Sequence, residues 1–123
     1  MVWKFDNDRS IYIQLVEQIQ NRIITGVYQP GSKLASVREL AGEAEVNPNT
    51  MQKALSELER MGLVYAKRTS GRYVTEDESM IEERKKMSAL QVIREFRDKM
   101  QALGYDEDEM IHLISESKEE QDI

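Results

Sequence analysis

The sequence predicts a mainly α fold that carries one small β-hairpin, with three helices before the hairpin and two after it. Three observations predict it. Apolar residues recur at three- and four-residue steps over most of the chain, two capped helices flank a tight connection, and two β-prone runs with a glycine between them follow. In that order the elements make a winged helix-turn-helix followed by a two-helix C-terminal dimerisation segment.

The composition excludes several classes of protein. With 123 residues and 40% apolar side chains, the chain suits one compact domain or a small domain plus an appendage. It has no cysteine and one histidine, so we expect no disulfide, no metal site, no cofactor and no His-based catalytic triad. No apolar run approaches the ~18 residues of a membrane span, and the N-terminus lacks the apolar segment of a secretory signal. We therefore expect a cytoplasmic protein without a membrane partner.

Charge divides the chain into two parts. Residues 1–75 carry 10 Lys and Arg against 8 Asp and Glu, whereas residues 76–123 carry 7 against 15. Local charge decides whether phosphate is attracted, because salt screens charges beyond about 8–10 Å. The first part can therefore attract phosphate although the whole chain has a net charge of −6. We expect one domain over residues 1–75 and a helical tail over residues 76–123.

The first helix is expected over residues 10–25, where Tyr12, Leu15, Val16, Ile19 and Ile23 share one face. Ser10 is a suitable N-cap and Gly26 a suitable stop.

The next two helices are marked by their N-termini. Ser36 and Glu39 have the spacing of a capping box, which predicts a short second helix. Asn47 is a suitable N-cap for the third helix, and Pro48 is preset for its first position. The third helix is expected to end at Gly62.

A hairpin is expected next, from residues 63–68 and 72–75 with a Thr-Ser-Gly turn between them. Its tip is expected to carry Lys67, Arg68 and Arg72.

The tail is expected to form a long helix over residues 79–103, ended by Gly104, and a short helix begun by the capping pair Asp106 and Glu109. One short helix cannot cover the stripe of this long helix, so we expect the stripe to bury itself against a second copy of the chain. The alternative is that the long helix packs on its own winged helix. The residues expected to form this dimer interface are Leu90, Ile93, Phe96, Met100, Leu103, Met110 and Ile114.

The third helix is the candidate reading element. Its apolar residues share one face, and Asn49, Thr50, Gln52 and Lys53 occupy the other. A helix fits the major groove of DNA, where Gln and Asn can bond to adenine and Lys can reach guanine or phosphate. Residues of this kind are often only a solvated helix face, but their position beside a basic hairpin favours DNA.

The chain resembles the GntR family of winged-helix regulators. The resemblance lies in residues 34–41 (LASVRELA) and 46–64 (VNPNTMQKALSELERMGLV), with residues 11–14 and 23–31 matching upstream. It covers residues 10–75 almost without a gap. The start of the third helix and the short helical tail are most similar to the YtrA subfamily.

The resemblance implies that Arg38 contacts DNA from the second helix, that Asn49, Thr50 and Gln52 read bases, and that Gly71 is the wing glycine near the minor groove. At three positions the chain departs from the family pattern, with Ala35 for Pro, Pro48 for Arg and Thr69 for Gly. The candidate DNA-contacting set is Ser36, Arg38, Asn47, Asn49, Thr50, Gln52, Lys53, Lys67, Arg68, Gly71 and Arg72.

The sequence thus predicts a regulator of transcription that binds double-stranded DNA, acting as a dimeric repressor on an inverted-repeat operator. The alternative is a winged-helix module whose partner is another protein. An enzyme is not expected, because no nucleophile, base and orienting group can be assembled from these residues. The sequence does not decide whether a small-molecule effector exists.

Overall fold

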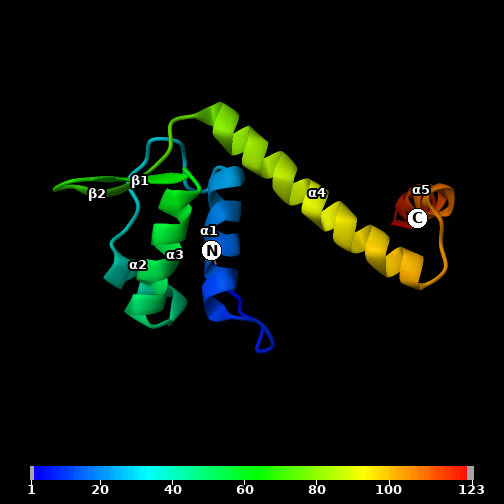
Figure 1. Cartoon of the computed structure of the whole chain (residues 1–123), viewed down its shortest axis with the longest axis horizontal. Helices are drawn as coiled ribbons and strands as arrows, with labels where there is room; N and C mark the ends of the chain where they lie inside the picture. Colours follow the sequence, from blue (N-terminus) through cyan, green and yellow to red (C-terminus); the bar gives the residue numbers. More distant parts are fainter. Residues whose placement is uncertain (1, 122–123) are drawn as a thin grey trace. The chain divides into compact units, whose positions relative to one another are not determined.

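The computed structural model describes residues 2–121, which fall into two compact units, one ending at Arg84 and the other starting at Lys85. The boundary lies inside a helix, whereas the sequence suggested one between residues 75 and 76. The first unit contains three helices and the hairpin, and the second contains most of a long helix and a shorter one (Figure 1). The predicted mainly α architecture with a two-stranded hairpin is confirmed.

Helix α1 (Ile11–Ile24) forms as its caps and apolar spacing predict. The Ser10 side chain accepts a hydrogen bond from the Ile13 amide, and Gly26 follows the helix with a φ of 80°. On its apolar face Leu15, Ile19 and Ile23 are at most 1% exposed and Tyr12 and Val16 are half-buried, and α1 packs along α3. α1 therefore supports the helix that presents the candidate reading face.

Helices α2 (Val37–Ala44) and α3 (Pro48–Arg60) begin as predicted. The Ser36 hydroxyl accepts from the Glu39 amide at 3.1 Å and the Glu39 carboxylate accepts from the Ser36 amide, which completes the capping box. The Asn47 carboxamide oxygen accepts from the Asn49 amide at 2.8 Å. Both caps are made by neighbours in sequence, which is why the sequence alone reveals them.

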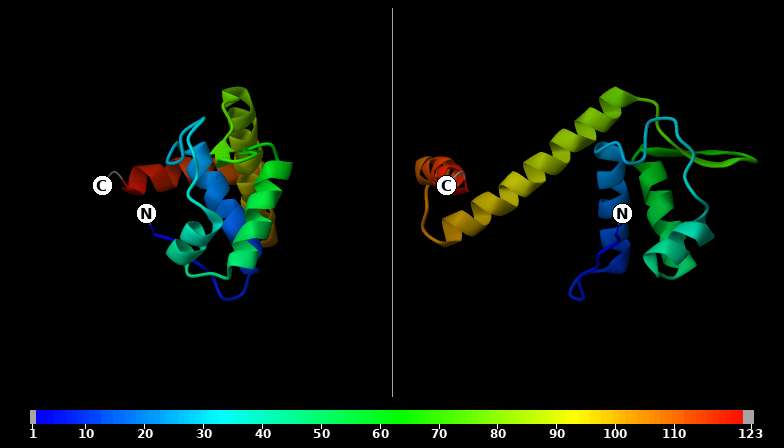
Figure 2. Two further views of the ribbon diagram at one scale, coloured as in Figure 1. Left: turned by 90° about the vertical axis from the view of Figure 1, so that its left-hand side faces the viewer. Right: turned by 180° about the vertical axis from the view of Figure 1, so that it is seen from behind.

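Strands β1 (Val64–Lys67) and β2 (Gly71–Val74) form the predicted hairpin, with Val64 opposite Val74 and Lys67 opposite Gly71. The segment before α2 runs antiparallel to β2, because the Leu34 amide donates to the Arg72 carbonyl and the Val74 amide to the Ser32 carbonyl, both at 2.9 Å. The hairpin extends outward from the helices of its unit (Figure 2).

The core of the first unit is aliphatic. It gathers one face of each helix and the inner ends of both strands. Its buried residues are Leu15, Ile19, Ile23, Leu34, Leu40, Ala41, Ala44, Met51, Ala54, Leu55, Leu58, Leu63, Val64, Val74 and Ile81. Each large side chain buried in this way contributes about 1.5–3 kcal/mol.

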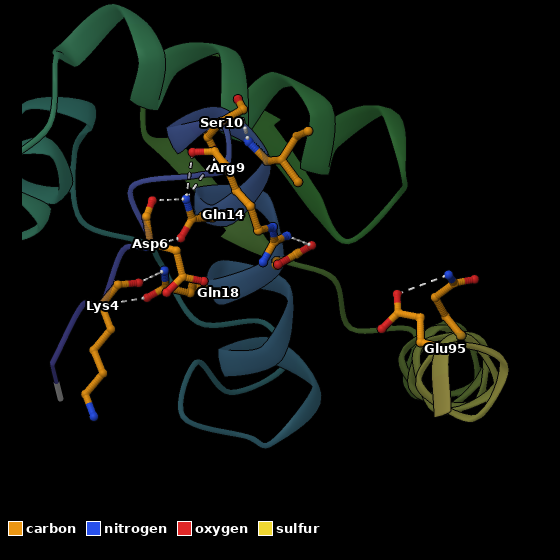
Figure 3. Close-up of polar contacts among 10 residues, drawn as sticks. Lys4, Asp6, Arg9, Ser10, Gln14, Gln18 and Glu95 are labelled. Atoms are coloured by element: carbon orange, nitrogen blue, oxygen red, sulfur yellow. Dashed lines mark hydrogen bonds and ion pairs between the residues drawn. The ribbon is translucent and has the colours of Figure 1, made fainter. Parts of the chain in front are cut away.

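Two glutamine side chains of α1 hydrogen-bond to the backbone of the N-terminal segment (Figure 3). The Gln14 carboxamide accepts from the Asp6 amide at 2.7 Å and donates to the Asp6 carbonyl at 3.0 Å, and Gln18 holds the Lys4 backbone in the same way. Further along α1, the buried Arg22 guanidinium lies 3.7 Å from the centre of the Trp3 ring. The segment thereby covers one side of the core.

Helix α4 (Glu78–Ala102) and helix α5 (Glu107–Gln121) confirm the two helices expected in the tail. Asp106 and Glu109 form a reciprocal capping pair at the start of α5. Within the second unit Met110 is buried, whereas Leu90, Ile93, Phe96 and Leu103 are exposed. Met110 therefore differs from these four residues, because it is already buried without a second copy of the chain.

The start of α4 gives a prediction about pH. Asp77 precedes the helix, and its carboxylate accepts from the Ser79 hydroxyl at 2.6 Å and the Met80 amide at 3.2 Å. The Ser79 hydrogen bond, followed by the Met80 amide, lowers the pKa of Asp77 below its usual value. Stabilisation by the ionised carboxylate is therefore complete above the unfolded pKa of about 3.9 and is lost as the pH falls through the lower, folded pKa.

We expect Asp77→Ala to lower the free energy of unfolding at pH 7 and to lose that effect as the pH falls below about 3.9. Urea denaturation of both proteins across this range measures the difference. A difference that persists unchanged at the acid end would contradict the assigned role of the carboxylate.

Candidate nucleic-acid interface

The face of α3 that points away from the core is polar. Met51, Ala54, Leu55 and Leu58 are at most 1% exposed, because they pack on α1, α2 and the hairpin. The opposite face presents Asn49, Gln52 and Lys53 as exposed side chains, with Thr50 half-buried. The fold thus brings the predicted reading residues together on one accessible helix face.

An open groove of about 710 Å³ runs beside this face. Thr50, Gln52, Lys53 and Ser56 form its α3 side, and Tyr12 from α1 contributes the other. Sequence reasoning placed Tyr12 only in the core, whereas the half-buried ring packs on the core and also lines the groove. Its contact across the groove depends on the packing of α1 against α3, which the apolar spacing of either helix does not reveal.

The far end of the groove carries an ion pair. The Arg60 guanidinium donates twice to the Glu57 carboxylate one turn back on α3. The Arg60 hydrogen bond holds the pKa of Glu57 below its usual value, and the same bond raises the pKa of Arg60. Arg60 is therefore compensated, and it adds less to the attraction of phosphate than a count of basic residues suggests.

A second groove, of about 550 Å³, lies between the start of α2 and the hairpin. Ser36, Gly71 and Arg72 line it together with Lys33, which the sequence analysis did not single out. Gly71 has a φ of 116°, and a Cβ there would stand 3.3 Å from the Lys33 Cε. A side chain at position 71 would therefore be strained, which agrees with its assignment as the wing glycine.

The hairpin presents fewer free cations than predicted. Arg72 directly follows Gly71 at the turn, but its side chain points back toward α3, where its Nε donates to the Glu59 carboxylate, so it is not a free cation at the tip. The Lys67 ammonium lies 4.5 Å from the centre of the Tyr73 ring, and Arg68 is exposed. The reversal of Arg72 arises from the packing of the hairpin on α3.

Arg38 on α2, Lys53 on α3 and Arg68 on the hairpin are exposed, and none of them forms an ion pair within residues 2–121. They come from three elements of the same unit. Ser36 and Asn47 are also exposed, but their side-chain oxygens cap helices. The free cations can approach phosphate without first breaking an ion pair.

The described residues offer no metal site and no membrane-spanning helix. No group of three or more His, Asp and Glu side chains there could hold a metal ion. No helix among them is both long and apolar enough to cross a membrane.

Comparison with known sequences finds a family match over most of the first unit. Residues 11–74 match the family described as bacterial regulatory proteins, gntR family. The HTH-type transcriptional regulator YhcF of Bacillus subtilis is 37% identical over 111 residues, which is 90% of this chain and 92% of YhcF. The HTH-type transcriptional repressor YtrA of the same organism is 45% identical over 67 residues, which is 54% of this chain and 52% of YtrA.

Solved structures agree. A GntR family transcriptional regulator from Listeria monocytogenes has a TM-score of 0.86 and 41% identity, and the match covers 91% of this chain and 98% of that one. The DNA-binding domain of AraR in complex with operator ORX1 has a TM-score of 0.52 and 28% identity over 58% of this chain and 93% of that one. The predicted resemblance to GntR and YtrA-like regulators is confirmed.

Proposed function

The chain belongs to the gntR family of bacterial regulatory proteins and is a DNA-binding regulator of transcription, and from this premise we propose that it is a homodimeric repressor of an inverted-repeat operator. The observation that carries the proposal is the exposed polar face of α3, flanked by free cations on α2 and the hairpin. Such a regulator acts where the bacterial chromosome lies, in the cytoplasm.

In the proposed complex the N-terminal half of α3 enters the major groove. Asn49 and Gln52 then read base edges, because their carboxamides can bond to adenine at both its ring nitrogen and its amino group. Arg38 and Arg68 hold phosphates on either side, which fixes the register without reading sequence. Ser36 and Asn47 contribute by shaping the helix N-termini that approach the DNA backbone.

The second copy is proposed to dock on the apolar stripe of α4. Phe96 is 37% exposed and Leu103 is 73% exposed, and Ile93, one turn before Phe96, and Met100, between the two, continue the same stripe. Steps of three and four residues align apolar side chains for packing against a parallel or antiparallel copy. Two winged-helix domains joined in this way, which we call the two reading heads, match a two-fold symmetric DNA site.

Repression rather than activation is favoured by one relative. YtrA is described as a repressor. A dimer that covers its operator can block transcription by occupying the promoter, and this requires no further surface for contacts with the polymerase.

Base reading by Gln52 has a direct test. Gln52→Ala should relax preference at one operator position by about 1–3 kcal/mol, because the adenine contact is lost. Lys53→Ala should weaken binding to every sequence more evenly. It should also reduce the slope of log affinity against log salt concentration by about one unit, because one phosphate contact is lost. Fluorescence anisotropy on single-base operator variants measures both. If Gln52→Ala weakens every duplex by one common factor, Gln52 is not a base reader.

DNase I footprinting tests the function itself. The full chain is titrated on DNA from upstream of its own coding sequence, with unrelated DNA of equal length as the control. We expect two protected segments related by an inverted repeat. If no DNA is protected even at concentrations at which the free chain is fully dimeric, the alternative is favoured, namely a module that binds protein.

A further inference from the structure

The ion pair between Glu59 and Arg72 is the feature of the candidate interface that DNA contact does not explain. Glu59 lies in the last turn of α3, and Arg72 lies in β2. Their Oε1 and Nε atoms are 2.5 Å apart, and their side chains are 32% and 19% exposed. The pair thus joins the candidate reading helix to the hairpin at a partly buried position.

The register of the hairpin directs Arg72 toward α3. Arg72 is paired with Ala66, and two residues further along Val74 is paired with Val64. Alternate residues of a strand share a face, so Arg72 is on the same face as Val74, which is fully buried in the core. The Arg72 backbone is fixed as well, because its carbonyl accepts from the Leu34 amide at 2.9 Å.

The other face of the hairpin carries the residues that remain available to DNA. Tyr65 and Tyr73 stack there with ring centres 5.8 Å apart, and Lys67 lies over Tyr73. A phosphate that bound Arg72 would have to break the ion pair between Arg72 and Glu59. The Glu59 carboxylate would then stay partly buried without a partner. Arg72 is therefore poorly suited to be a phosphate ligand.

We propose that Glu59 and Arg72 form a latch that fixes the hairpin against the C-terminal end of α3 and so sets the spacing between the bases read by α3 and the DNA contacted by the hairpin. Both are positioning residues for sequence discrimination rather than DNA ligands. The proposal rests on the proposed function, because it assumes that α3 and the hairpin contact one DNA site.

The readout is the ratio of the affinities for operator and for non-specific DNA. Glu59→Gln and Arg72→Gln should each lower this ratio about fivefold, in the range of a partly exposed ion pair. Arg72→Gln should leave the slope of log affinity against log salt unchanged, whereas Arg68→Ala should reduce it by about one unit. The double variant should be no worse than either single variant, because both remove the same contact.

A charge exchange, Glu59→Arg combined with Arg72→Glu, should restore much of the ratio. Glu17→Gln is the matched control, because it removes an α1 carboxylate from the ion pair with Arg9, which precedes α1, without touching the hairpin. This control should leave the ratio unchanged. A lower salt slope for Arg72→Gln, or an unchanged ratio for Glu59→Gln, would overturn the latch.

Hydrogen exchange separates the latch from the proposed function. In the absence of DNA, Glu59→Gln should speed exchange of the β1 and β2 amides, and Glu17→Gln should not. Equal protection in all three proteins would overturn the latch on its own. If the wild-type chain bound operator and non-specific DNA equally, the proposed function would fail while the exchange result still decided whether the pair holds the hairpin.

Discussion

Phe96→Asp is expected to convert the protein from a dimer to a monomer and to lower its affinity for the full operator about 100- to 10,000-fold. Phe96 lies in the middle of the exposed apolar stripe of α4, so the substitution places a charge where the second copy would bury it. Joining two reading heads makes binding of the second half-site intramolecular, and a monomer loses that advantage. Affinity for an isolated half-site should therefore hardly change.

Sedimentation equilibrium measures the association, and anisotropy on full and half operators measures the binding. Met87→Asp is the matched control. Met87 is also an exposed apolar residue of α4 and precedes Phe96 by nine positions. At 100° per residue this separation places it on the opposite side of the helix from Phe96. Circular dichroism should show that both variants remain folded. A Phe96→Asp protein that stays dimeric and binds the full operator normally would refute the assignment of the stripe.

Arg38→Ala is expected to weaken operator binding by about 1–3 kcal/mol for each DNA-bound head. Arg38 is exposed on α2 and forms no ion pair within the described chain, so its guanidinium is free to make a charge-assisted contact with phosphate. The side chain lies outside the core, so the free energy of unfolding should change little.

The control for this variant is Arg94→Ala, which removes an exposed arginine from α4 and leaves the first unit intact. Anisotropy titrations at several salt concentrations distinguish a specific contact from a general loss of charge. Equal affinities for the Arg38→Ala and wild-type proteins, with the fold unchanged, would remove Arg38 from the interface.

Much of the fold could be predicted because its boundaries are encoded locally. The capping box at Ser36, the N-cap at Asn47 and the paired caps at Asp106 and Glu109 each form within four residues of sequence. Apolar spacing then identified the buried face of each helix in the first unit. The order of the elements, joined to the motifs that resemble the GntR family, was enough to predict the fold class.

The features that were missed depend on contacts between distant segments. Gln14 is buried although polar, because the N-terminal segment folds back over α1 and hydrogen-bonds to its carboxamide. Arg22 is buried because the Trp3 ring of that segment covers its guanidinium, which donates to the Tyr28 hydroxyl. Arg72 looked like a free cation because Glu59, its partner, lies thirteen positions earlier in the chain on another element. Spacing within one element cannot reveal such partners.

The second unit illustrates the same limit. Its apolar stripe was predicted, but Met110 was assigned to the dimer interface because it continues the apolar pattern. In the folded unit Met110 is only 2% exposed, whereas Ile114, one turn later on α5, is 54% exposed. Periodicity places both residues on similar faces, and only the packing decides which of them is left for a second copy.

The central claim is that two copies of the chain bind one two-fold symmetric DNA site through α3. Selection of bound duplexes from a random library by the full chain, followed by the mass of the complex on the selected duplex, tests it most directly. We expect an inverted repeat whose half-sites are centred one helical turn, about 10–10.5 base pairs, or a multiple apart, with two chains bound. Enrichment of a sequence without two-fold symmetry, or a complex containing one chain, would contradict it.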